Sequence, residues 1–172
     1  MARNIEIKAA VPDPGRLHAL VALVADSGPV ELHQTDTFFH SGSGRLKLRE
    51  FSDGDAELIY YERADGHAPE ESFYLLTPIP DPGPLRESLA RTNGIAGVVS
   101  KIRQLYLRGR TRIHLDEVTG LGHFVELEVV LAGDEPSESG RREATDLMSR
   151  LSILPEHLID KAYIDLILER MS

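Results

Sequence analysis

Cysteine and tryptophan are both absent from this chain of 172 residues. Without cysteine the protein can form no disulfide, no thiolate zinc site and no catalytic cysteine. Long apolar runs are missing too: no segment approaches the ~20 apolar residues of a membrane span, and the first residues lack the apolar run of a signal peptide. We therefore expect a soluble, cytoplasmic protein that does not engage a membrane.

Positive charge is also scarce, with 19 Lys and Arg against 28 Asp and Glu and a formal net charge of −9. This balance argues against a nucleic-acid-binding protein, whose domain should be basic. No repeat, low-complexity tract or long linker divides the sequence, so residues 1–172 are expected to form a single domain. A domain of this length buries about two-thirds of its unfolded surface and needs no covalent staple.

The hydrophobic pattern switches repeatedly between the period of a strand and that of a helix. Strands are expected at Asn4–Val11, Glu31–Phe39, Arg45–Phe51, Glu57–Ala64, Glu71–Leu76, Val98–Leu107, Thr111–Glu117 and His123–Leu131. Helices are expected from Pro12 to a stop at Ser27-Gly28-Pro29, from Pro80 to Asn93-Gly94, from Ser139 to Leu151 and from Pro155 to Met171. Hairpin-length turns dominate, which predicts an α+β protein with a mostly antiparallel sheet.

Charged side chains in these strands recur with period two, so those of one strand share a face. The cations in this pattern are Lys8, Arg45, Lys47, Arg49, Arg63, Lys101, Arg103 and Arg112. The carboxylates are Glu6, Asp116, Glu126 and Glu128. Each strand alone also fits the solvated outer face of an ordinary antiparallel sheet. Taken together the signs are segregated, one strand purely cationic and another purely anionic, which favours a site for a charged ligand.

If these faces converge, the concavity holds four more cations than carboxylates, and the rest of the protein is correspondingly more acidic. So many cations need a counter-ion, because removing each from water costs several kcal/mol. A phosphate chain supplies the negative charge, and carboxylates beside it can hold a divalent metal that the phosphates also coordinate. The pattern thus predicts a binding site for a polyphosphate with Mg²⁺ or Mn²⁺.

Six motifs resemble, in order, those of the CYTH family, also described as triphosphate tunnel metalloenzymes. They are Asn4-Ile5-Glu6-Ile7-Lys8, similar to an ExExK signature, then Gln34–Phe39, Arg45–Arg49, Tyr61–Arg63, Lys101–Arg103 and His114–Glu128. The last of these, with Ala162–Leu166, is most similar to the class IV adenylyl cyclase-like branch. The resemblance implies an eight-stranded antiparallel β-barrel, a triphosphate tunnel, with helices packed outside.

The resemblance also implies roles for the charged residues. The eight cations would bind phosphate oxygens, Glu6, Asp116, Glu126 and Glu128 would bind the metal, and Lys8 and Glu6 would be catalytic. Family members convert ATP to cyclic AMP and pyrophosphate or hydrolyse tripolyphosphate, thiamine triphosphate or nucleoside triphosphates, so ATP, tripolyphosphate and thiamine triphosphate are the expected small-molecule partners. The sequence does not decide between cyclisation and hydrolysis, and it leaves the oligomeric state open, a homodimer included.

One residue departs from the family pattern. The first glutamate of ExExK is replaced by Asn4, which can still offer a carbonyl oxygen to a metal but has no charge. A non-catalytic polyphosphate- or nucleotide-binding module is therefore the rival interpretation. His114 is equally compatible with a metal or phosphate ligand and with a hydrogen-bonded structural histidine, and Tyr163 with a tunnel residue and a core residue.

Overall fold

The computed structural model describes residues 2–63 and 68–172. The strands are β1 (Ala2–Ala10), β2 (Ser27–Phe39), β3 (Arg45–Phe51), β4 (Ala56–Arg63), β5 (Glu70–Pro78), β6 (Ile95–Arg108), β7 (Thr111–Val118) and β8 (Gly122–Leu131). The helices are α1 (Pro14–Val24), α2 (Pro82–Thr92), α3 (Ser137–Arg150) and α4 (Tyr163–Met171), with a 3₁₀ turn at Pro155–His157. No helix in the described part of the chain is both long enough and apolar enough to cross a membrane.

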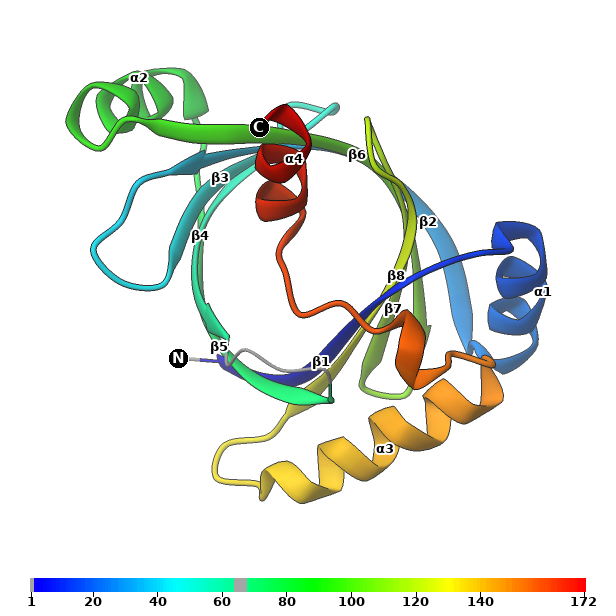
Figure 1. The fold of residues 1–172 in the computed structure, drawn as a ribbon. Helices are drawn as coiled ribbons and strands as arrows, with labels where there is room; N and C mark the ends of the chain where they lie inside the picture. The colour runs from blue at the N-terminus through cyan, green and yellow to red at the C-terminus, as the bar shows by residue number, and fades with distance from the viewer. Residues whose placement is uncertain (1, 64–67) are drawn as a thin grey trace.

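The eight strands close into one barrel in the order β1-β5-β4-β3-β2-β6-β7-β8. Every neighbouring pair is antiparallel, and β1 closes the ring by pairing with both β5 and β8. The predicted eight-stranded antiparallel barrel is confirmed. Figure 1 looks down its axis and shows the helices outside the ring or at its end.

The apolar core lies between the outer face of the barrel and the helices. One cluster joins Leu17 and Val21 of α1 and Leu147 of α3 to Ile7 of β1 and Leu127 of β8. Where α3 crosses β1, the backbones approach so closely that a Cβ on Gly140 would lie 2.7 Å from a side-chain atom of Ile5. Because the apolar face of the barrel points outward, the alternate residues of the same strands turn their polar side chains inward.

The structure corrects two predicted boundaries. The expected helix from Pro155 to Met171 is instead a 3₁₀ turn, an extended segment and the shorter α4. The extended segment is fixed by β1, because Leu158 pairs with Ala9 and the Ile159 N–H donates to the Lys8 carbonyl. Ser27-Gly28-Pro29, expected to end a helix, instead begins the long strand β2, and α1 ends at Val24.

Two more of the predicted strand boundaries can be compared with the structure. Ala64, the expected last residue of one strand, lies outside the described residues. The strand predicted at Glu71–Leu76 runs from Glu70 to Pro78.

Candidate functional site

A cavity of about 740 Å³ occupies the barrel and is lined by side chains from all eight strands and from Tyr163 of α4. We call it the barrel cavity. The cations that the sequence predicted to share a site all line it: Lys8, Arg45, Lys47, Arg49, Arg63, Lys101, Arg103 and Arg112. The predicted carboxylates Glu6, Glu126 and Glu128 line it as well. Asp116 is buried next to it and holds Arg103.

Asp36 of β2 lies among three of these cations. Its Oδ1 accepts from Arg49 Nε at 2.7 Å, and its Oδ2 accepts from Arg49 Nη2 at 2.7 Å and from Lys47 Nζ at 3.0 Å. Lys101 Nζ of β6 reaches the same Oδ2 at 3.4 Å. The side chain of Asp36 is only 1 % exposed. One buried carboxylate thus holds three cations from two strands at fixed positions.

Burial and charge shift the pKa values of this cluster in opposite directions. Burial alone would raise the pKa of Asp36, but Arg49, Lys101 and Lys47 hold it well below its usual value. For Lys101, burial lowers the pKa to about 7, and Arg49 and Arg103 lower it further against the pull of Asp36. Lys101 is therefore a cation whose charge near neutral pH depends on the negative charge beside it.

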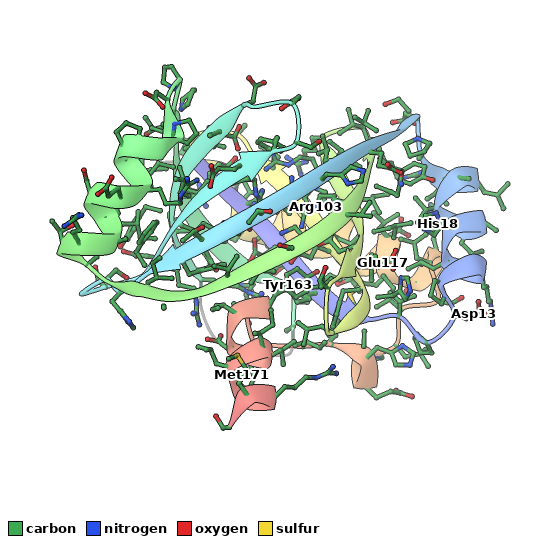
Figure 2. The ribbon with its side chains drawn as sticks, turned by 90° about the horizontal axis from the view of Figure 1, so that it is seen from above. Asp13, His18, Arg103, Glu117, Tyr163 and Met171 are labelled. Carbon is green, nitrogen blue, oxygen red and sulfur yellow. The ribbon has the colours of Figure 1, made fainter. Side chains whose placement is uncertain are left out.

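A second cluster surrounds Arg103 of β6. Its Nε and Nη2 donate to the two oxygens of Asp116 at 2.7 Å each, and Nη2 also donates to Glu126 Oε2 at 2.8 Å. The Tyr163 hydroxyl donates to Asp116 Oδ2 at 2.8 Å, and the Lys8 ammonium lies 4.1 Å from the centre of the Tyr163 ring. Figure 2 shows Tyr163 at the start of α4, beneath the barrel and below Arg103. Tyr163 is therefore a residue of the cavity wall.

A third cluster contains the remaining carboxylates. Glu6 Oε1 lies 3.2 Å from Arg63 Nε, and Glu128 Oε2 lies 2.9 Å from Arg112 Nη2. Burial raises the pKa of Glu6 to about 7, while Arg63 lowers this pKa and Glu128 and Glu126 raise it. Glu6 is therefore a carboxyl group whose protonation changes near neutral pH.

The C-terminal helix covers one end of the barrel. Figure 1, viewed along the barrel axis, shows α4 in front of the upper part of the ring, and Figure 2 shows it beyond one end of the strands. Arg45, the first residue of β3, forms a forked contact with Asp165 of α4, Nη1 to Oδ1 at 3.1 Å and Nη2 to Oδ2 at 2.6 Å. The Ala162 N–H also donates to Asp165, which holds the start of the helix against this arginine.

The predicted excess of four cations over carboxylates in the concavity is wrong. Besides the eight cations, seven carboxylates line the barrel cavity among the described residues. Four of the seven were not in the predicted set: Asp36, Glu57, Glu62 and Asp160. Every predicted cation lies within 4 Å of a carboxylate oxygen of the protein. The cavity is therefore densely charged but nearly neutral.

Comparison with known proteins identifies the fold. The CYTH domain family model matches residues 2–163. The chain belongs to the CYTH family. The family resemblance of the sequence motifs is thus confirmed.

Individual relatives carry related names. A candidate adenylate cyclase of Methanocaldococcus jannaschii is 29 % identical over 68 residues, 40 % of this chain and 39 % of that protein. The PH1012 protein of Pyrococcus horikoshii has a TM-score of 0.85 at 27 % identity, covering 95 % of this chain and 98 % of that one. HpAC1 of Hippeastrum, a candidate adenylyl cyclase with a dominant triphosphatase activity, has a TM-score of 0.66 at 16 % identity, with 99 % and 96 % coverage.

The inner residues of this CYTH barrel fit a divalent cation. Donor atoms of His114, Glu126 and Glu128 lie within 4.8 Å of one another. His114 Nδ1 and Asn4 Oδ1 are buried without a hydrogen-bond partner in the described part of the chain. Carboxylate and amide oxygens are the ligands that Mg²⁺ and Mn²⁺ prefer, so the oxygens of Asn4, Glu126 and Glu128 suit either ion.

The cavity of the CYTH barrel differs between its two ends. Tyr163 and Asp165 lie near Arg45, the first residue of β3. The other end of β3 is Phe51, about 20 Å away along an extended strand. Leu32, Phe51, Leu76 and Leu105 add apolar surface to the cavity wall. A ligand with a charged chain and an apolar group therefore finds both kinds of surface in this cavity.

Several site residues were missed or left open by the sequence analysis. Asp36 was quoted in a motif but given no role, because its position directly opposite Arg49 depends on the β2–β3 register, which strand parity alone does not report. Asp165 was assigned to a helix without reference to Arg45, and no sequence pattern links residues 120 positions apart. His114 is placed beside Glu126 by the β7–β8 register, a contact that the hairpin between them fixes.

Proposed function

We propose that the barrel cavity binds a small-molecule triphosphate together with Mg²⁺ or Mn²⁺, and that the protein processes it enzymatically. The observation that carries this proposal is the convergence of eight Lys and Arg side chains, from five strands, on one cavity of about 740 Å³. Charge-assisted hydrogen bonds from such side chains to phosphate oxygens are short and strong. CYTH relatives named as adenylate cyclases or as a triphosphatase support the same substrate class.

The cations have two proposed roles in binding the phosphate chain. Arg45, Arg49, Arg63, Arg103 and Arg112 offer planar forks, and Lys8, Lys47 and Lys101 offer point charges. The forks fix the orientation of the chain, because each can hold two oxygens at once. The lysines neutralise the negative charge that spreads over the phosphate oxygens during transfer.

Glu6, Glu126 and Glu128 are the proposed metal ligands, and Asn4 offers its unpartnered Oδ1. When bound, the cation neutralises charge on the phosphate oxygens. Asp116 was also predicted as a ligand, but both of its oxygens already accept from Arg103, and one also from Tyr163. We therefore assign Asp116 the role of positioning Arg103.

Glu6 and Lys8 are the proposed proton-transfer groups. A carboxyl whose pKa is raised to about 7 is well suited to accept or release a proton at neutral pH. Lys8 Nζ lies 3.4 Å from Glu126 Oε1 and donates to the Lys161 carbonyl at 3.1 Å. These contacts keep Lys8 beside the carboxylates of the proposed metal site.

Two reactions use the same triphosphate contacts. In cyclisation, the ribose 3′-oxygen of ATP forms a bond to the α-phosphorus, and the bond to pyrophosphate breaks. In hydrolysis, water forms a bond to the terminal phosphorus, the bond from that phosphorus to its bridging oxygen breaks, and the diphosphate part of the substrate leaves, so inorganic phosphate and a diphosphate are the products. The apolar surface contributed by Leu32, Phe51, Leu76 and Leu105 favours an organic triphosphate over inorganic tripolyphosphate in either case.

The test incubates the purified chain with ATP, thiamine triphosphate or tripolyphosphate, each with Mg²⁺ or Mn²⁺, and resolves cyclic AMP from released phosphate. Arg49→Ala should abolish product formation, because it removes the fork beside Asp36. Arg91→Ala is the matched control, since Arg91 is exposed on α2 and pairs only with Glu87 in the described contacts. No product from any substrate would refute the enzyme proposal.

A binding module is the second proposed function, favoured by Asn4 in place of a carboxylate. One negative charge fewer at the metal site weakens the hold on a divalent ion. Calorimetry distinguishes the two functions. Tight tripolyphosphate binding that needs no metal, with no turnover, would select the binding module over the enzyme.

A further inference from the structure

His114 of β7 faces the two glutamates of β8 across their shared hairpin. The register sets His114 opposite Glu126 and Arg112 opposite Glu128. His114 Nδ1 lies 3.6 Å from Glu126 Oε2 and 3.8 Å from Glu128 Oε1. These distances are too long for good hydrogen bonds. The imidazole is therefore near both carboxylates without being bound to either.

Nothing else in the described residues occupies this nitrogen. His114 is 5 % exposed, and its Nδ1 is buried without a hydrogen-bond partner there. A structural histidine normally satisfies both ring nitrogens, because a buried polar atom without a partner costs stability. A buried nitrogen without a hydrogen-bond partner, close to two carboxylate oxygens, is in a suitable position to bind a metal ion together with them.

Glu126 and Glu128 can share a metal ion with His114 Nδ1 while keeping some of their present contacts. Glu128 uses Oε2 for Arg112, and its other oxygen is the one nearest His114. Glu126 pairs through Oε1 with Lys8. Its Oε2 pairs with Arg103 and is also the oxygen nearest His114 Nδ1. One oxygen of each glutamate therefore points toward a common point with the imidazole.

We propose that His114, Glu126 and Glu128 form a mixed nitrogen–oxygen site that prefers a borderline divalent transition metal, such as Co²⁺ or Zn²⁺, to Mg²⁺. Such ions hold nitrogen and oxygen ligands at about 2.0–2.2 Å, which places donor atoms roughly 3 Å apart. Donor separations of 3.6 and 3.8 Å need only small side-chain rotations to reach this geometry. Imidazole suits these ions, whereas Mg²⁺ prefers oxygen ligands alone.

This inference rests on the proposed function only in sharing Glu126 and Glu128 with it. The inference goes beyond the proposed function because it adds a nitrogen ligand and, with it, an order of metal preference. In the absence of any phosphate, the affinity is expected to increase from Mg²⁺ through Mn²⁺ and Co²⁺ to Zn²⁺.

The test titrates Co²⁺ and Mg²⁺ by calorimetry into the full chain, free of any affinity tag and of phosphate. The wild type should bind one Co²⁺ at least about tenfold more tightly than Mg²⁺, and His114→Gln should weaken Co²⁺ binding by about tenfold or more. Mg²⁺ binding should change less than about twofold. His33→Gln is the matched control, because His33 lies 2.9 Å from Glu31 but is half exposed, outside the barrel cavity.

Unchanged Co²⁺ affinity in His114→Gln, or equal wild-type affinities for the two ions, would overturn the proposal and leave His114 a structural residue. If His114→Gln does not fold, a measurement on the wild-type protein still tests the proposal. In electron spin echo spectra with bound Mn²⁺, a ¹⁴N coupling from His114 is expected, and its absence would overturn the proposal. Tripolyphosphate titration in parallel separates the two hypotheses. Tripolyphosphate binding without Co²⁺ preference defeats only the mixed site, whereas Co²⁺ preference without tripolyphosphate binding defeats only the proposed function.

Discussion

Replacing Asp36 by Asn tests whether one buried carboxylate holds the cationic side of the cavity together. The substitution keeps the size of the side chain and removes its charge. Arg49, Lys47 and Lys101 then lose the acceptor that all three share. Arg49 cannot shed its proton in a protein, so at least one buried cation stays uncompensated.

The expected cost follows from the burial of the cluster. Removing one partner of a buried ion pair costs about 3–5 kcal/mol, because the other charge remains out of water. Lys101 limits this cost, since its pKa is already lowered to about 7 and it can lose its proton once Asp36 is neutral. For a chain of this length, about 3–5 kcal/mol corresponds to a loss of roughly 6–20 °C in Tm.

Urea denaturation and thermal unfolding measure this effect at neutral pH. Glu31→Gln is the matched control, an exposed carboxylate on the same strand, and its Tm should stay within a few degrees of the wild type. The pKa of Asp36 is held below its usual value, so its contribution is complete above about pH 3.8 and is lost as the pH falls through the folded-state pKa. The difference between Asp36→Asn and wild type should therefore narrow in acid.

Tripolyphosphate supplies the decisive comparison. Its oxygens can replace the lost carboxylate, so a saturating concentration should raise the Tm of Asp36→Asn by more than that of the wild type. The reasoning would be refuted if Asp36→Asn unfolded within about 1 kcal/mol of the wild type, or if tripolyphosphate stabilised both proteins equally.

Three further predictions concern other residues of the cavity. Glu128→Ala should lower metal-dependent turnover by about a hundredfold or more with an unchanged far-UV circular dichroism spectrum, because Arg112, its partner, is one-third exposed and can reach solvent; unchanged turnover would remove Glu128 from the site. Arg49→Lys should weaken tripolyphosphate binding by about tenfold in calorimetry, since a point charge replaces a fork; wild-type affinity would count against forked contacts there. Burial lowers the pKa of Lys101 to about 7 from 10.5, so the unfolded chain binds more protons between these values and the free energy of unfolding should rise with pH across that window; Lys101→Met should flatten this rise in urea titrations at pH 7–10, and an unchanged slope would contradict the assignment.

The fold was predictable because polar and apolar residues alternate along its strands and because glycine-containing turns separate many of them. Parity placed Lys47 between Arg45 and Arg49 on one face, and in the barrel all three point inward. The segment before α4 was not predictable, since its apolar spacing fits a helix until the backbone of β1 offers hydrogen bonds to Leu158 and Ile159. A local sequence pattern therefore does not predict the conformation of a segment whose hydrogen-bond partners lie on a strand far away in the sequence.

The same limit applies to the site. Strand parity reports which face a side chain takes, and it found all eight cations of the cavity. It does not report which carboxylate each cation meets, because those contacts join β2 to β6 for Asp36 and Lys101, and β3 to α4 for Arg45 and Asp165. Counting only the repeating charges therefore overestimated the positive charge of the interior.

The pairing of cations with carboxylates inside the barrel changes how a phosphate chain can bind. A cavity with free cations would fill with any polyanion, but here each cation already has a carboxylate, so a phosphate chain must exchange for one. A divalent cation on Glu126 and Glu128 weakens the hold of these carboxylates on Lys8 and Arg112, and so makes two cations available to phosphate, while Arg103 stays paired with Asp116. Metal and phosphate should consequently bind with positive coupling, and by thermodynamic reciprocity each must raise the affinity of the other by the same factor. Separate titrations of either ligand alone therefore understate the affinity of the site.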